Sequence, residues 1–235
     1  MGVLSKPTIL KYLEEGIIVI DPFNEENLNN ASYDVRLGKY FFRQRNLDNV
    51  SIFNPFYEKS VRNMYQEVEE AVPVKEVRSE KNPFYNLADD DLVILIAPGE
   101  TILAHTLEFI GGRNIPEKNI AITTEMRARS SIGRIGITVC KCAGWGDVGY
   151  INRWTMEITN FSNSIIPLPV GMRIAQIIFL QVSEIIDTES VYAGRKYQGS
   201  DDLEELKKNW SPEMMIPRLY EDKDIGNFQK YKDDI

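Results

Sequence analysis

The sequence has few of the residues that most often bind metals or form disulfides. It contains one histidine, His105, and two cysteines, Cys140 and Cys142. On a strand, residues two apart point to the same side and lie alongside each other, which is poor geometry for a disulfide. Free thiols in a reducing compartment are therefore the favoured interpretation, with a metal or redox pair as the alternative.

Long apolar runs are also lacking. No apolar stretch approaches the roughly 18 residues that a membrane-spanning helix needs. Residues 1–7 have no signal-peptide core, and Lys6 stands where a myristoylation motif has Ser or Thr. We therefore expect a soluble, cytoplasmic protein with no membrane partner.

An excess of positive charge is absent too. The chain has 35 acidic and 27 basic side chains, a formal net charge of −8. Binding to nucleic acid through phosphate contacts needs a basic face, so we expect no nucleic-acid partner. A single nucleotide is still allowed, because a few local Arg and Lys side chains can bind a triphosphate in an acidic protein.

The sequence is rich in short strand patterns separated by turn residues. With 235 residues, 43% of them hydrophobic, the chain can bury one ordinary core. One short helix is expected near residues 5–15, closed by Gly16. Strand patterns follow at 17–20, 32–37, 92–96, 101–104, 119–124, 135–139, 153–159 and 172–182. Many strands with few helices predict an all-β fold with short helices, either a β-sandwich or a jelly-roll-like barrel.

Two segments of the chain contain polar side chains that suggest a catalytic or binding role. Alternation along the 153–159 strand puts Trp154 and Met156 on one face and Glu157 on the other. A carboxylate in a packed strand is costly unless it is paired or used, although a solvated outer face explains it equally simply. Arg129 precedes Ser130 and Ser131 where a short helical turn is expected to begin, and the free N–H groups of such a turn favour an anion.

Six motifs in order resemble the dCTP deaminase family, a branch of the dUTPase-like superfamily that includes bifunctional dCTP deaminase/dUTPase relatives. The resemblance covers roughly residues 4–199. The motifs are Asn30–Gly38, Arg129–Arg134, Ala143–Tyr150, Thr155–Ile158, Gly171–Phe179 and Lys196–Gly199.

The resemblance implies the distorted jelly-roll β-barrel of that superfamily and a homotrimer whose sites are shared between subunits. Residues 1–200 are expected to form the deaminase domain. Residues 44–91 are expected to be an elaborated excursion of that domain, and 201–235 an acidic C-terminal extension. The polar face of the 32–37 strand is either solvated or, by the resemblance, a structural signature beside the subunit interface.

The resemblance also implies catalytic roles. Glu157 matches the family's catalytic glutamate, Ser130 and the carbonyl of Ala143 would hold the attacking water, and Arg134 would supply positive charge. An interface ion pair is the alternative for Arg134. Zinc deaminases need a His or Cys followed by Glu and then Pro-Cys-x-x-Cys, which this sequence lacks, so we expect no zinc and a structural role for His105.

The remaining matches concern the nucleotide. Arg129 and Ser131 would contact the triphosphate, which brings Mg²⁺ with it. Asp147, which is otherwise a plain turn residue, would receive the 3′-hydroxyl, and Tyr150 would lie beneath the sugar. A closing lid, otherwise a solvated tail, would contribute Tyr192, Lys196 and Gln198.

The implied activity is hydrolysis of dCTP to dUTP and ammonia. The alternatives are a bifunctional enzyme giving dUMP and pyrophosphate, a dUTPase, or a nucleotide-binding protein without catalysis. The chain departs from the family pattern at Ala128, Cys140, Cys142, Gly146 and Ser200. The departures at Cys140 and Cys142 put feedback inhibition by dTTP in doubt.

Overall fold

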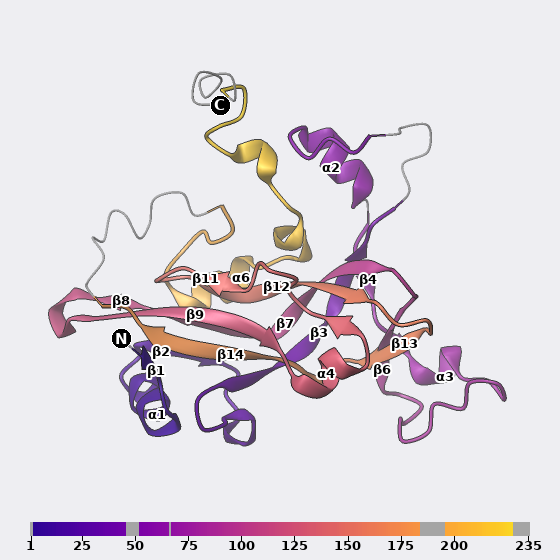
Figure 1. The fold of residues 1–235 in the computed structure, drawn as a ribbon, viewed down its shortest axis with the longest axis horizontal. Helices are drawn as coiled ribbons and strands as arrows, with labels where there is room; N and C mark the ends of the chain where they lie inside the picture. Colours follow the sequence, from indigo (N-terminus) through magenta and orange to yellow (C-terminus); the bar gives the residue numbers. More distant parts are fainter. Residues whose placement is uncertain (1, 46–51, 66, 184–195, 228–235) are drawn as a thin grey trace.

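The structure, a computed structural model, describes residues 2–45, 52–65, 67–183 and 196–227. Antiparallel strands form its framework (Figure 1). The strands of the larger sheet are β1 (Gly2–Val3), β2 (Ile18–Asp21), β3 (Tyr33–Arg43), β4 (Glu69–Glu70), β7 (Thr101–Gly112), β8 (Asn114–Ile115), β9 (Ile120–Ala128), β10 (Ile137–Thr138), β11 (Trp145–Gly146), β12 (Ile151–Asn160) and β14 (Arg173–Gln181). A smaller sheet contains β5 (Val72–Pro73), β6 (Leu92–Ile96) and β13 (Ile166–Pro169).

The larger sheet runs in the order β10-β12-β7-β3-β14-β9-β11, and β1, β2, β4 and β8 pair at its sides. Consecutive strands in space are often distant in sequence, as in β7 beside β12 and β3 beside β14. The sheet curls around one large apolar core. The expected mainly-β class with short helices is therefore confirmed.

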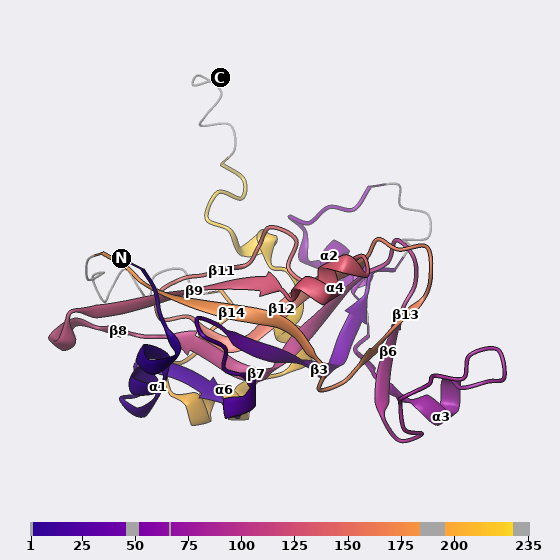
Figure 2. The same ribbon diagram turned by 60° about the horizontal axis from the view of Figure 1, so that its bottom comes forward.

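Helices are short and lie around the sheets. They are α1 (Lys6–Glu14), α2 (Glu58–Met64), α3 (Val74–Val77), α4 (Ser130–Arg134) and α6 (Leu203–Asn209), with 3-10 turns η1 (Glu25–Asn27), η2 (Pro116–Lys118), η3 (Pro212–Met215) and η4 (Leu219–Glu221). The predicted first helix is confirmed as α1, and Gly16 closes it with a φ of +67°. Figures 1 and 2 show α1 and α3 at opposite ends of the molecule.

One predicted strand is shorter than expected. The pattern at 135–139 predicted a strand, but β10 begins only at Ile137. Gly136 has a φ of +86°, a left-handed conformation that a strand residue does not adopt. The chain therefore turns at Gly136, between α4 and the strand.

Side chains from the two faces of the sheet enter different apolar clusters. The inner cluster is the main core and includes Ile102 and Ala104 of β7 with Trp154, Met156 and Ile158 of β12. The outer cluster consists of Phe42, Val61, Tyr65, Leu103, Met215 and Ile216. A third cluster consists of Val19, Phe109, Ile151 and Leu206. Parts of the 44–91 excursion and of the C-terminal extension therefore pack on the sheet.

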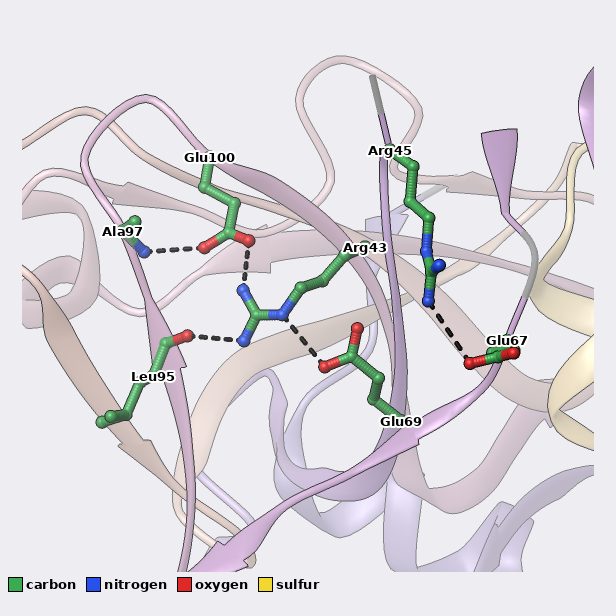
Figure 3. A network of polar contacts seen from close by, with 7 residues as sticks. All are labelled: Arg43, Arg45, Glu67, Glu69, Leu95, Ala97 and Glu100. Carbon is green, nitrogen blue, oxygen red and sulfur yellow. Dashed lines mark hydrogen bonds and ion pairs between the residues drawn. The ribbon is translucent and has the colours of Figure 1, made fainter. Parts of the chain in front are cut away.

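The excursion is tied back to the sheet by an arginine at the end of β3. Arg43 donates from Nε to Glu69 (3.1 Å) and from Nη2 to the Leu95 carbonyl (2.9 Å), and it also pairs with Glu100, as Figure 3 shows. Arg45 lies 3.4 Å from Glu67 in the same view. These contacts join β3 to the returning limb of the excursion, to β6 and to the connection between β6 and β7.

Candidate active site

Glu157 lies in the middle of β12, directly across the ladder from Leu103 of β7. Directly opposed residues on antiparallel strands point to the same face, so Glu157 faces the outer cluster. Its Oε2 atom is buried and has no hydrogen-bond partner in the described part of the chain. Burial raises the pKa of Glu157 to about 7, against smaller opposing effects of its own backbone N–H and of Lys141.

Three side chains from outside β12 act electrostatically with Glu157. Lys141, in the turn before β11, lowers the pKa of Glu157, although burial outweighs it. The charge of Glu157 in turn adds to the raised pKa of Cys140 and of Tyr65, both of which are raised first by burial. Lys141 has a φ of +46°, an uncommon conformation for a residue other than glycine.

A hollow of about 760 Å³ lies beside this turn. Thr138, in its lining, is paired with Thr159 and so points to the same face as Glu157. The Oγ1 atom of Thr138 is buried without a partner in the described residues. The lining also includes Glu125, Arg127, Cys140, Lys141, Cys142, Trp145 and Phe161. The hollow thus combines polar groups with an open aromatic rim.

The predicted anion-binding turn is present as α4. Ser130, Ser131 and Arg134 are exposed, whereas Ile132 anchors the helix in the inner cluster. That cluster is lined by the faces of β7 and β12 that turn away from Glu157. No hydrogen bond or ion pair joins Glu157 to Ser130 or Arg134 in the described chain, so one chain does not bring these predicted catalytic groups together.

Arg129 immediately precedes α4 and is held by a buried acid. Its Nε atom lies 3.1 Å from Oδ2 of Asp34, and its Nη1 donates to the Arg173 carbonyl at 3.1 Å. Asp34 also lies 3.3 Å from Nη1 of Arg173 and accepts from Asn29 at 2.9 Å. The polar face expected for the 32–37 strand therefore orients a predicted triphosphate-binding arginine.

The Ala143–Tyr150 motif precedes β12 and consists of the short strand β11 between two turns. Ala143 is exposed and its N–H donates to the Cys140 carbonyl at 2.8 Å, in the turn that also carries Lys141. Asp147 is exposed, and its carbonyl accepts from the Tyr150 N–H at 3.0 Å. The Tyr150 ring meets Trp154 edge-on, with centroids 5.6 Å apart, and burial raises the pKa of Tyr150.

Two of the three predicted lid residues lie in the described segment, and both are engaged within the chain. Lys196 forms an ion pair with Asp222. Gln198 is buried: its Oε1 accepts from the Ile151 N–H at 2.8 Å, and its Nε2 donates to the Gly149 carbonyl at 3.2 Å. Tyr192 lies outside the described residues.

His105 and Gly146 are both closely packed against neighbouring residues. The His105 ring packs against Gly38, where an added Cβ would lie 2.0 Å from it, and burial lowers the pKa of His105 to about 4. A Cβ on Gly146 would lie 2.4 Å from Oγ1 of Thr124 and 2.5 Å from the Trp154 ring. The Trp154 ring therefore occupies the space beside residue 146, where the chain departs from the family pattern.

No group of three or more His, Cys, Asp or Glu side chains suited to a metal ion occurs among the residues that the structure covers. The same part of the chain has no helix long and apolar enough to cross a membrane.

Sequence reasoning missed Lys141 and Tyr65. Lys141 lies between the two cysteines but belongs to none of the six motifs. Tyr65 lies in the excursion, where neither periodicity nor a motif marks it. The pairing of Arg129 with Asp34 was also missed, although the alternation of the 32–37 strand had indicated a polar face there.

Comparisons with known proteins agree with this arrangement of motifs. The family model described as dCTP deaminase-like matches residues 3–182. A protein named dCTP deaminase, dUMP-forming, from Methanopyrus kandleri is 33% identical over 205 residues, which are 86% of this chain and 93% of that protein. Another of the same name, from a Hydrogenobaculum species, is 32% identical over 183 residues, 78% of this chain and 84% of that protein.

A solved structure of 2′-deoxycytidine 5′-triphosphate deaminase from Agrobacterium tumefaciens has the same fold. The TM-score is 0.50 at 17% sequence identity, with 81% of this chain covered. The chain spans about half the length of that structure, 51%. On the strength of the family model and the relatives, the chain belongs to the dCTP deaminase-like family.

Proposed function

We propose that this protein is a dCTP deaminase in which Glu157 activates a water molecule. The observation that carries the proposal is the partly buried Glu157 side chain, whose Oε2 atom is buried with no partner among the described residues and whose pKa is raised to about 7. A carboxyl group with such a pKa can both accept and donate protons near neutral pH. The names of the relatives support dCTP as the substrate.

In the proposed reaction, Glu157 takes a proton from water as the water oxygen bonds to C4 of the cytosine ring. The proton passes to N3, giving a tetrahedral intermediate. Glu157 then moves the hydroxyl proton to the 4-amino group. The C4–N bond breaks, ammonia leaves with the bonding electrons, and a carbonyl forms at C4. Glu157 is again a carboxylate at the end.

The catalytic groups of α4, Ser130 and Arg134, would come from a second copy of the chain, whereas Ala143 lies in the same-chain turn as Lys141, which acts electrostatically on Glu157. Ser130 and the Ala143 carbonyl would hold the water, and Arg134 would stabilise the intermediate electrostatically. Because α4 is anchored on the side of the sheet opposite to Glu157, a complete site requires α4 from a neighbouring subunit. This supports a homotrimer with shared sites.

Nucleotide binding would use the exposed residues around these turns. Arg129 and Ser131 suit phosphate oxygens, since a guanidinium and a hydroxyl donate to them directly. Mg²⁺ would arrive on the triphosphate as part of the substrate. Asp147 would accept the 3′-hydroxyl near Tyr150. A phosphate contact by Lys196 would require exchange of its ion pair with Asp222.

A dUMP-forming enzyme is the second candidate, and the names of the two relatives with 32% and 33% identity favour it. In that reaction, Asp147 would orient a second water towards the α-phosphate after deamination. The residues assigned to the first step would be the same.

The test is incubation of the protein with dCTP and Mg²⁺, followed by ion-exchange separation of nucleotides and an ammonia assay. Ammonia with dUTP supports the deaminase, and ammonia with dUMP and pyrophosphate supports the dUMP-forming enzyme. Release of dUMP from added dUTP, with dCTP untouched, would indicate a dUTPase instead. Unchanged dCTP that nevertheless binds would contradict both candidates.

A further inference from the structure

The excursion and the C-terminal extension meet on the face of the sheet that carries Glu157. Val61 and Tyr65 come from the excursion, and Met215 and Ile216 from the extension. All four are buried, with exposed fractions of 5% or less. They share one apolar cluster with Phe42 and Leu103, which are partners across the β3–β7 ladder. Figure 1 shows α2 and the C-terminal segment rising from the same side of the sheet.

Each half of this contact is fixed to the sheet separately. The excursion pairs with β3 through β4 and is held by Arg43 (Figure 3). The extension is held by Trp210, whose ring lies 4.6 Å from the His105 ring and 4.6 Å from the Arg153 guanidinium. Two independently anchored segments therefore converge on one apolar contact.

Within this contact, the Tyr65 hydroxyl is the group whose pKa is affected by the charge of Glu157. The charge of Glu157 contributes to the raised pKa of the Tyr65 hydroxyl. That hydroxyl accepts a hydrogen bond of 2.8 Å from Nε2 of Gln44, which fixes the ring. Since Leu103 lies opposite Glu157 and belongs to the outer cluster, the Glu157 side chain lies on the same face of the sheet as that cluster.

We propose that the excursion and the extension together form a cap over the Glu157 side of the sheet, and that Tyr65 is its positioning residue, keeping water from the carboxylate. The proposal deepens the proposed function and rests on it for its catalytic consequence. It assigns a role to residues 44–91 and 201–235, two segments that none of the six motifs covers. The unpartnered Oε2 of Glu157 fits a dry pocket whose polar partner arrives with the substrate.

Other titratable groups around Glu157 have to be separated from the effect of the cap. They are Lys141 and Cys140 in the turn before β11, Tyr65 in the cap, and Arg153 and His105 farther along the same faces of β12 and β7. The test therefore changes Tyr65, whose raised pKa leaves it uncharged between pH 5 and pH 8, and one cap residue that does not titrate. It compares both with a similarly buried residue of the extension in another cluster.

The experiment uses Tyr65→Ser and Met215→Ser, one from each half of the cap, with Leu206→Ser as the matched control. Leu206 is also a buried residue of the extension but belongs to the third cluster. Serine is chosen because an apolar cavity stays dry, whereas a hydroxyl gives an entering water a partner. Each chain is made with and without Glu157→Gln, and its free energy of unfolding is measured at pH 5 and pH 8.

In the chain with an unchanged cap, the gain in unfolding free energy from Glu157→Gln should grow from pH 5 to pH 8. The reason is that the unfolded chain loses the Glu157 proton near the ordinary pKa of 4.5, whereas burial keeps that proton on the folded chain up to about pH 7. We expect this growth to fall at least twofold in Tyr65→Ser and in Met215→Ser, and to persist in Leu206→Ser. If one cap variant does not fold, the other gives the answer. Equal growth in all the chains would overturn the proposal.

Deamination gives a second measurement. The pH at which kcat/KM for dCTP reaches half its maximum should move down towards the ordinary glutamate range in the cap variants, but not in Leu206→Ser. If no chain released ammonia, the proposed function would fail, while the unfolding measurement would still decide whether the cap excludes water.

Discussion

The Nε atom of Arg129 lies 3.1 Å from Oδ2 of Asp34, a carboxylate with only 4% of its side chain exposed. Asp34 is on β3 and Arg129 follows β9, so the contact spans two strands that both pair with β14. A buried carboxylate is stable only when it is paired and hydrogen-bonded. Asp34 meets that need with Arg129, Arg173 and Asn29, and it thereby sets the direction of the Arg129 guanidinium at the start of α4.

Replacing Asp34 with asparagine should change the position of the Arg129 guanidinium and leave the deamination step itself unchanged. We expect Asp34→Asn to raise the KM for dCTP about tenfold, the effect of about 1.4 kcal/mol of lost binding, with kcat little changed. Steady-state kinetics over a range of dCTP concentrations measures both quantities. The control is Glu15→Gln, which removes an ion pair with Lys118 and should leave KM as it is. A fall in kcat alone would contradict a positioning role.

Glu157→Gln keeps the shape of the side chain but cannot take up a proton from water. Because one carboxyl group would serve several proton transfers, we expect ammonia release to fall by about 10²- to 10⁴-fold. Binding of dCTP, measured by calorimetry, should change by less than about threefold, since the amide still fits the pocket. An active Glu157→Gln enzyme would rule out the assignment of this residue as the base.

The pH dependence of kcat/KM should follow the ionisation of Glu157. Glu157 must be ionised to accept the first proton, and its pKa in the free protein is raised to about 7. The kcat/KM for dCTP should therefore rise about tenfold per pH unit below pH 7 and level off above it. A profile flat between pH 5 and 8 would show that ionisation of Glu157 does not limit the reaction.

The parts of this architecture that local patterns determine were predictable from the sequence. Period-2 alternation predicted that the Glu157 side chain lies on the other face of its strand from Trp154 and Met156, and the structure has this arrangement. The outer cluster was not predictable, because Tyr65 and Ile216 are far apart in the chain and neither belongs to a periodic pattern. The partner of Arg129 was missed for a related reason: alternation gives the face of Asp34 but not which strand lies beside it.

His105 should make the protein sensitive to acid. Its pKa is lowered to about 4 by burial, whereas an unfolded histidine has a pKa of 6.5. As the pH falls from 6.5 to 4, the unfolded chain gains a proton that the folded chain does not bind, so stability is lost in this window, by at most about 3 kcal/mol. His105→Gln should show a flatter dependence in urea unfolding between pH 7 and 4.5. Parallel curves for the two proteins would argue against a neutral buried histidine.

Substitutions at Gly146 and Trp154 should have non-additive effects on the free energy of unfolding, because the indole ring occupies the space that a side chain at residue 146 would need. An added Cβ would lie 2.5 Å from the Trp154 ring, well inside the contact distance. Gly146→Ala should therefore destabilise the protein by about 1–3 kcal/mol, the usual cost of overpacking. In a Trp154→Leu background the ring is gone, so the same alanine should cost less than about 1 kcal/mol, although Trp154→Leu is itself destabilising. Thermal unfolding of the four proteins in this cycle measures the coupling. If the alanine costs the same in both backgrounds, the strain comes from Thr124, whose Oγ1 is the other close neighbour at 2.4 Å.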